Sequence, residues 1–175
     1  MNPSFTLHNF SASEILANLD ALAEVLSHCV HGGASVSFML PFSTESALAF
    51  WRRTAESTAR HERVVLVAKD AGQRIVGTVQ MVIDQPENQP HRADVAKLLV
   101  HESARRKGVA RALMQRLEEV AIDTHKTVLV LDTATGSGAE QFYHQCGWHK
   151  SGEIPRYALM PDGELTATSI FYKFL

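Results

Sequence analysis

The chain has 175 residues, which is enough for one domain with a full hydrophobic core and short for two. Its formal net charge is −2, so it lacks the general basic field that would hold nucleic acid or a membrane surface. The two cysteines, Cys29 and Cys146, lie far apart, which argues against a disulfide framework or a zinc site. We therefore expect one domain spanning residues 1–175, in the cytoplasm and without a metal.

Two helices in the first half of the chain are marked by residues that cap their N-termini. Ser11 and Glu14 form a capping box, and apolar residues then recur at helical spacing to about His31. Ser43 or Thr44 caps the second helix, which is expected to end near residue 60. The other elements expected here are a strand at 4–8, an apolar loop at 34–41, and a hairpin of strands 64–68 and 75–83. The exposed apolar loop is explained if it lines a substrate pocket.

The second half predicts two strand–helix–strand units. A strand at 91–100 leads through a basic turn into a helix that ends near residue 124. The continuous apolar run at 127–133 predicts a central strand that is covered on both faces. The other elements expected are a short helix at 139–145, a strand to about 153, a loop at 155–160 and a last strand at 168–174. Such units beside hairpins predict an α+β protein with a mixed sheet layered by helices.

The junction within residues 95–124 has the features of an anion site. Four basic residues, Arg105, Arg106, Lys107 and Arg111, fall within seven positions of the point where the strand meets the helix. A helix N-terminus aims several backbone N–H groups at one point, where an anion binds well. Gly108 lets the backbone approach the ligand because it has no Cβ. The Walker and dinucleotide glycine patterns are both missing, so the anion is not expected to be part of ATP or NAD.

Two motifs in this half resemble those of the GNAT superfamily of acyl-CoA-dependent N-acyltransferases. They are Val100-His101-x-x-x-Arg105-x-x-Gly108-x-Ala110-x-x-Leu113 and Ala139-x-x-Phe142-Tyr143-x-x-x-Gly147-Trp148. Both occur in the family's order and at its separation. The resemblance implies the GNAT fold, in which helices flank a mixed, mostly antiparallel central sheet. It also implies acetyl-CoA as the co-substrate, bound without a metal.

The resemblance further implies which residues hold acetyl-CoA. Backbone amides of the basic turn would bind the pyrophosphate, and the preceding strand would pair with the pantetheine arm. The residues expected to bind acetyl-CoA are Leu98, Leu99, Val100, Arg105, Arg106, Lys107, Gly108, Val109, Ala110, Arg111 and Tyr143. The family often has Pro and Gly where this chain has Glu102 and Arg106, and the charge of Glu102 is expected to weaken the anion site slightly.

Direct amide formation needs a neutral amine, and the leaving thiolate needs a proton. The resemblance implies that Tyr143 supplies that proton, whereas the alternative is a packed aromatic side chain. Asp94, inside a strand, and Asp132, at the end of another, are candidates for the base or for carboxylates that bind the amine, and burial would raise the pKa of either. The alternatives are a salt bridge for Asp94 and a turn cap for Asp132. His31 and His101 are weaker candidates.

Six residues are expected to contact the acceptor, namely Ser35, Phe38, Asn88, Asp94, Asp132 and Tyr157. Segments 31–36, 92–95, 131–133 and 161–163 are similar to the tabtoxin resistance type of acetyltransferase, which implies a toxin-like amino acid as acceptor and a role in resistance. The expected partner is thus a small-molecule amine, and the choice between monomer and homodimer stays open. The alternatives are a protein-lysine acceptor, another acyl group, or a non-catalytic module that binds CoA.

Overall fold

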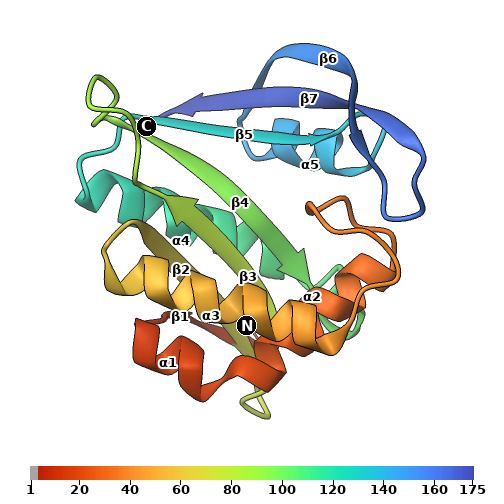
Figure 1. The fold of residues 1–175 in the computed structure, drawn as a ribbon. Coiled ribbons are helices and arrows are strands. Elements are labelled where there is room, and N and C mark those ends of the chain that lie inside the picture. Colours follow the sequence, from red (N-terminus) through yellow and green to blue (C-terminus); the bar gives the residue numbers. More distant parts are fainter. Residues whose placement is uncertain (1–3) are drawn as a thin grey trace.

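The computed structural model describes residues 4–175, which build one seven-stranded sheet with helices on both faces (Figure 1). The strands lie in the order β1-β2-β3-β4-β5-β7-β6. The strands are β1 (Phe5–Asn9), β2 (Arg63–Asp70), β3 (Ile75–Val82), β4 (Arg92–Val100), β5 (Val128–Ala134), β6 (His149–Leu159) and β7 (Leu165–Phe174). The helices are α1 (Ala12–Ala17), α2 (Leu19–His31), α3 (Thr44–Ala59), the short 3-10 turn η1 (Glu102–Ala104), α4 (Val109–Asp123) and α5 (Ala139–Gln145). None of the helices in this part of the chain is both long and apolar enough to cross a membrane.

Neighbouring strands run antiparallel except β4 and β5, which are parallel. These two strands pair only where Arg92–Asp94 meets Val128–Val130. Beyond that point they diverge, and β4 continues to Val100 while β5 continues to Ala134 (Figure 1). The expected mixed, mostly antiparallel sheet is therefore confirmed, and its one parallel contact is short.

Each face of the sheet has its own apolar core. Helices α1 to α3 cover one face, where Trp51 of α3 and Leu22 of α2 are fully buried. Helices α4 and α5 cover the other face. A Cβ on Gly77 of β3 would lie 3.0 Å from Cγ1 of Val109 and 3.2 Å from Cδ1 of Leu113, so this glycine lets α4 begin directly against the sheet. The start of α4 is thereby fixed relative to β3 and β4.

The first predicted helix is two helices, α1 and α2, separated at Asn18. The expected capping box is present, since Ser11 N–H donates to the Glu14 carboxylate and Glu14 N–H donates to Ser11 Oγ. The Asn18 side-chain amide donates to the carbonyl oxygen of Glu14 at 2.8 Å, and its backbone leaves the helical region at φ −124°. A short polar side chain that bonds the backbone competes with the helix in this way.

Two expectations about the last strands were wrong. In β5, Leu129 and Leu131 are buried against α4, but Val130 is half-buried and Asp132 is exposed, so only one face is fully covered. The face of β5 that carries Asp132 is not fully covered because it borders the cavity where β4 and β5 diverge. The loop expected at 155–160 is mostly strand, because β6 runs to Leu159 with an irregularity between Ile154 and Ala158.

Candidate active site

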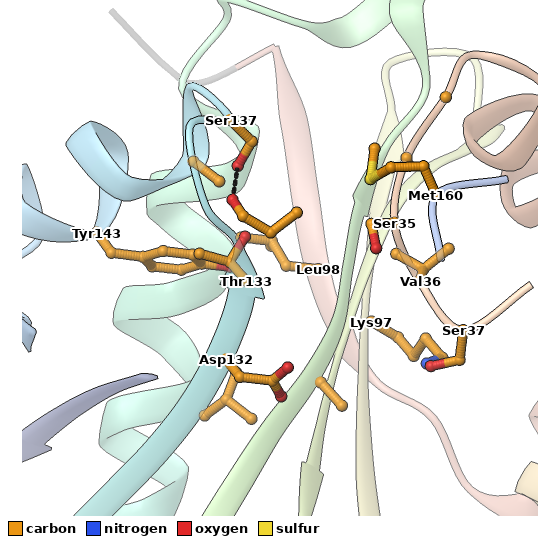
Figure 2. Close-up of a pocket in the computed structure, with 16 residues that line it drawn as sticks. Ser35, Val36, Ser37, Lys97, Leu98, Asp132, Thr133, Ser137, Tyr143 and Met160 are labelled. Atoms are coloured by element: carbon orange, nitrogen blue, oxygen red, sulfur yellow. Dashed lines mark hydrogen bonds between the residues drawn. The ribbon is translucent and has the colours of Figure 1, made fainter. Parts of the chain in front are cut away.

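A cavity of about 290 Å³ lies where β4 and β5 diverge. Residues 95–98 of β4 form one wall and residues 132–134 of β5 form the other (Figure 2). The loop at 33–37, the start of α5 and Met160 complete the lining. The cavity exists because the two parallel strands stop pairing before they end.

Strand β4 contains a bulge beside this cavity. Thr78 pairs with Leu99 and Gln80 pairs with Ala96, so two residues, Lys97 and Leu98, oppose only one on β3. Lys97 has a φ of 55°, in the left-handed region. In a regular strand Lys97 would share the buried α4 face, but the bulge turns its side chain away from that core. A cation is thereby moved from an apolar interior to the cavity wall.

The ammonium of Lys97 lies 3.2 Å from Oγ of Ser37 and over the ring of Phe38, with its nitrogen 5.7 Å from the ring centroid. Burial lowers its pKa, and the nearby charge of Arg63 lowers it further, whereas Asp132 acts in the opposite direction. Lys97 was not among the expected site residues. A lysine within the apolar sequence 95–100 was the signal that could have identified it.

Asp132 carries its carboxylate on the β5 wall of the cavity (Figure 2). Its Oδ2 accepts a hydrogen bond from the buried hydroxyl of Thr168, at 3.0 Å. Asp132 and Lys97 form no ion pair with each other, although the charge of Asp132 acts to raise the pKa of Lys97. Asp132 is exposed, so its carboxylate is available to an amine in the cavity.

Tyr143 reaches the same cavity from α5 (Figure 2). The residue is 8% exposed and its ring lies against Phe142, Trp148 and Phe171. Burial raises the pKa of its phenol to about 12, helped by Cys146 and Asp132. The hydroxyl therefore keeps its proton at neutral pH and can donate a hydrogen bond to an anionic group in the cavity.

Two of the loops that line the cavity are joined by a hydrogen bond beside it. The N–H of Leu40 donates to the carbonyl oxygen of Pro161 at 2.9 Å, which joins the loop after α2 to the β6–β7 turn. Figure 1 shows that loop, in orange, beside the turn, in blue. The β6–β7 turn also supplies Met160 to the lining. The apolar loop expected at a pocket thus does line one, and it is held there.

A second cavity, also about 290 Å³, lies at the expected anion site. Its lining includes Val100, Arg105, Gly108, Arg111 and the side of α5 at Phe142. Helix α4 begins there without a side-chain cap or an acidic residue in its first turn, and Gly108 has a φ of 81°. An uncapped helix start of this kind offers backbone N–H groups to an anion, so the residues fit a pyrophosphate.

The basic side chains at this site point in different directions. The guanidinium of Arg105 donates to the carbonyl oxygen of Val100, and that of Arg111 donates to the carbonyl oxygen of Gln145. The ammonium of Lys107 instead donates to Ser103, and Lys107 lines a separate cavity. Glu102 carries the negative charge that was expected to weaken the anion site. Its Oε2 lies 3.6 Å from Nε2 of His28.

The two cavities are neighbours along β4. Leu98 lines the first and Val100 lines the second, and two residues of a strand span roughly 6–7 Å. On α5, Tyr143 faces the first cavity and Phe142 the second. The two cavities therefore lie next to each other along β4, and we call them together the path between the helix start and the tyrosine.

The structure does not bring every expected residue to the cavity. Ser35 lines it, whereas Phe38 lies behind Lys97 and packs on Phe42 and Phe50. Leu99 is buried under the helices of the opposite face. The residues that lie outside the lining are Asp94, Asn88, Tyr157, His31 and His101.

Asp94 stands at the end of the β4–β5 pairing, where the strands are still together. Its carboxylate is paired with Arg92 and also accepts a hydrogen bond from the side chain of Gln85. The side chain is 43% exposed. The structure thus contains the alternative that the sequence left open for Asp94, a salt bridge, and its partner is Arg92.

The loop before α5 is fixed by Glu140. Its Oε2 accepts the N–H of Gly136 at 2.9 Å, and its Oε1 accepts the Lys150 ammonium at 3.0 Å. A hydrogen bond from Ser169, together with those from Gly136 and Lys150, lowers the pKa of this carboxyl to about 2. The contact stabilises the segment that carries Ser137 into the cavity lining (Figure 2).

Comparison with known proteins identifies the family. Residues 33–148 match the model of the acetyltransferase (GNAT) family. Among solved structures, the protein yncA from Salmonella typhimurium, determined with its cofactor acetyl-CoA, is 19% identical with a TM-score of 0.79, over 98% of this chain and 94% of that one. A ribosomal-protein-alanine N-acetyltransferase from Brucella melitensis is 23% identical with a TM-score of 0.77, over 97% and 99%. A structure described as a candidate phosphinothricin N-acetyltransferase is 19% identical with a TM-score of 0.80, over 98% and 99%. The matched segment contains both strands of the cavity, the uncapped helix start and Tyr143, and the chain belongs to the acetyltransferase (GNAT) family, whose members use acetyl-CoA.

Proposed function

We propose that this enzyme transfers an acetyl group from acetyl-CoA directly to the amine of a small molecule, as one domain of residues 1–175. The observation that carries the proposal is the walled cavity between β4 and β5, beside which Leu40 and Pro161 join two of the lining loops. Its volume of about 290 Å³ is near the lower end for small-molecule sites. An acceptor that is part of a protein chain would instead need an open groove here, to admit the backbone on either side of the reacting residue.

The path along β4 accommodates the donor in this proposal. The N–H groups at the start of α4 hold the pyrophosphate, and backbone groups of Leu98 and Val100 pair with the pantetheine arm. This arrangement places the thioester beside Tyr143. Holding both substrates in one cavity contributes much of the rate, because the reaction becomes effectively unimolecular.

The chemistry then needs two proton transfers. Asp132 accepts a proton from the acceptor ammonium, directly or through a water, and frees the nitrogen lone pair. The nitrogen forms a bond to the acetyl carbon as the carbon–sulphur bond breaks. Tyr143 donates its proton, or a hydrogen bond, to the departing thiolate, and its raised pKa keeps that proton available. Asp94 is the second candidate for the base, but it would act only through an intervening chain of groups.

The nature of the acceptor is the least constrained part of the proposal. Solved structures of this fold are named both for ribosomal-protein alanine and for phosphinothricin as the acceptor. The similarity to the tabtoxin resistance type and the walled cavity both favour a small acceptor, with a toxin-like amino acid and a resistance role as the specific form.

Measurement of free thiol tests this function. Acetyl-CoA is incubated with the enzyme and a panel of small amines, and in parallel with tetrapeptides that present the same residues at a free N-terminus or as lysine. We expect thiol release with small amines and much slower release with peptides. Faster turnover of peptides would overturn the small-molecule assignment, and binding of acetyl-CoA without thiol release to any acceptor would favour a non-catalytic module.

A further inference from the structure

Lys97 is a positive charge inside the acceptor cavity without an anionic partner. Its ammonium has three donors, and among residues 4–175 only Ser37 accepts one of them. It forms no ion pair with any carboxylate in this part of the chain. Two donors are therefore available to a ligand.

The surroundings of Lys97 keep the charge in place. The ring centroids of Phe38 and Phe50 lie 5.7 and 5.9 Å from its nitrogen, and aromatic faces attract a cation. The bulge directs the half-buried side chain to this wall. Burial without a counter-ion is costly for an ammonium, and a bound anion would remove that cost.

A second cation stands on the same side of the sheet. Arg63 donates to the side chain of Gln80, and Gln80 pairs directly with Ala96 of the cavity wall. Within the described residues, Nε of Arg63 and Nε2 of Gln80 are buried and have no hydrogen-bond partner. The β4 side of the cavity thus has excess positive charge, whereas the β5 side carries the carboxylate of Asp132.

We propose that Lys97 binds a carboxylate of the acceptor, so that the preferred substrates carry both an amine and an acid group. The amine lies at Asp132 and the carboxylate lies at Lys97 and Ser37. This inference rests on the proposed function, since it assigns the acceptor class of the same cavity. Lys97 thereby determines specificity and takes no part in the proton transfers.

Pairs of acceptors that differ only in the acid group test the proposal. Each amino acid is compared with its carboxamide, and kcat/KM is measured by thiol release for the wild type, Lys97→Met, Lys97→Arg and Lys69→Met. Lys69 is a matched control, because its ammonium lies 5.3 Å from the Phe10 ring centroid and away from the cavity. For each variant we take the ratio of kcat/KM for the acid to kcat/KM for the carboxamide. Comparing this ratio among variants cancels the intrinsic reactivity of each amine.

We expect the preference for the acid to fall about 10- to 100-fold in Lys97→Met, the range for one hydrogen bond to a charged group. Most of the change should be a higher KM for the acid, with little change for the amide. Lys97→Arg should restore much of the preference, and Lys69→Met should leave it unchanged. Should Lys97→Met fold poorly, as judged by circular dichroism, Lys97→Gln provides the same comparison.

Two results would overturn the assignment of Lys97. One is an unchanged ratio in a folded variant, and the other is an equal loss for acid and amide, which would indicate a general structural or catalytic role. The proposed function has a separate criterion, which is turnover of small amines by the wild type. Small amines acetylated without any preference for acids would refute only the role of Lys97, whereas turnover confined to peptides would refute both.

Discussion

The hydroxyl of Thr168 donates a hydrogen bond to Oδ2 of Asp132 at 3.0 Å, across the β5–β7 pair. Because Thr168 is buried, this contact restrains the orientation of the Asp132 carboxylate, which lines the cavity. Asp94 has a different environment, since Arg92 and Gln85 both occupy its oxygens and it lies outside the cavity lining. The two candidate carboxylates therefore differ in their access to an amine.

Replacement of these two carboxylates should separate their roles. Asp132→Asn is expected to lower kcat/KM for the amine about 100-fold or more, because it removes the only one of the two carboxylates that lines the cavity. Asp94→Asn should lower it less than about 5-fold, with the loss traced to the Arg92 contact. Steady-state kinetics at saturating acetyl-CoA measures both. A larger effect of Asp94→Asn would exchange the two assignments.

The phenol of Tyr143 should matter for turnover and not for affinity. Tyr143→Phe is expected to lower kcat about 10- to 100-fold, because the ring still fills the space between Trp148 and Phe171 but the proton donor is lost. The dissociation constant of acetyl-CoA, measured by calorimetry, should change little. Tyr172→Phe on β7 is the control, since Tyr172 does not line the cavity. An unchanged kcat would remove Tyr143 from the mechanism.

Substitution of Gly108 should lower both the stability of the fold and the affinity for acetyl-CoA. Its φ of 81° is strained for any residue with a Cβ, so Gly108→Ala is expected to cost about 1–2 kcal/mol of unfolding free energy. A Cβ there would meet no protein atom within 4 Å, so it would project into the space left for the ligand. We expect acetyl-CoA to bind roughly 10-fold more weakly, by calorimetry.

Gly163 provides the comparison for that experiment. It has a φ of 93° in the β6–β7 turn and is equally free of neighbours, but it lies away from the anion site. Gly163→Ala should therefore lose similar stability without losing affinity for acetyl-CoA. Equal losses of affinity in the two variants would mean that Gly108 acts through stability alone.

The carboxyl of Glu140 should give the protein an acid-dependent stability. Its folded-state pKa of about 2 is below the ordinary 4.5, so its stabilisation is fully present above about pH 4.5 and is lost as the pH falls toward 2. Glu140→Gln should lower the unfolding free energy by about 1 kcal/mol at pH 7, the effect being limited by solvent screening. Urea unfolding at pH 7, 4 and 3 should show the two proteins converging.

Glu153→Gln is the matched variant for that series. Glu153 also contacts Lys150, but its side chain is 43% exposed and its pairing does not extend to the loop before α5. Its substitution should change the unfolding free energy little at any pH. A difference between Glu140→Gln and the wild type that persisted unchanged to pH 3 would mean that the loss arises from packing and not from ionisation.

Much of the fold could be predicted from local patterns, because those patterns depend on near neighbours. The capping box at Ser11 and Glu14 is present, and helix α3 begins after Ser43 as expected. The break at Asn18 was missed, since it depends on a single side-chain bond to Glu14 that competes with the helix. The apolar run of β5 indicated a strand correctly, but the sequence could not show that its partner β4 turns away from it.

The site was predicted in part for a similar reason. Arg105, Gly108, Arg111 and Tyr143 lie in two short motifs, so the sequence alone could predict that they lie near one another, whereas Lys107 of the first motif lines a separate cavity. Lys97 reaches the cavity through a bulge and Met160 lies there beside a contact between two loops, while Thr168 acts from outside the lining by a cross-strand hydrogen bond to Asp132. Such long-range placements leave no local periodicity in the sequence.

The bulge in β4 makes the length of this strand as important as its composition. Lys97 and Leu98 together oppose the single residue Val79, so the chain is one residue longer here than a regular ladder requires. Deleting that residue would shift either end of β4 by one position and exchange inward and outward side chains on one side of the cavity. Between Ala93 and Val100, an insertion or deletion should therefore be tolerated less well than a conservative substitution.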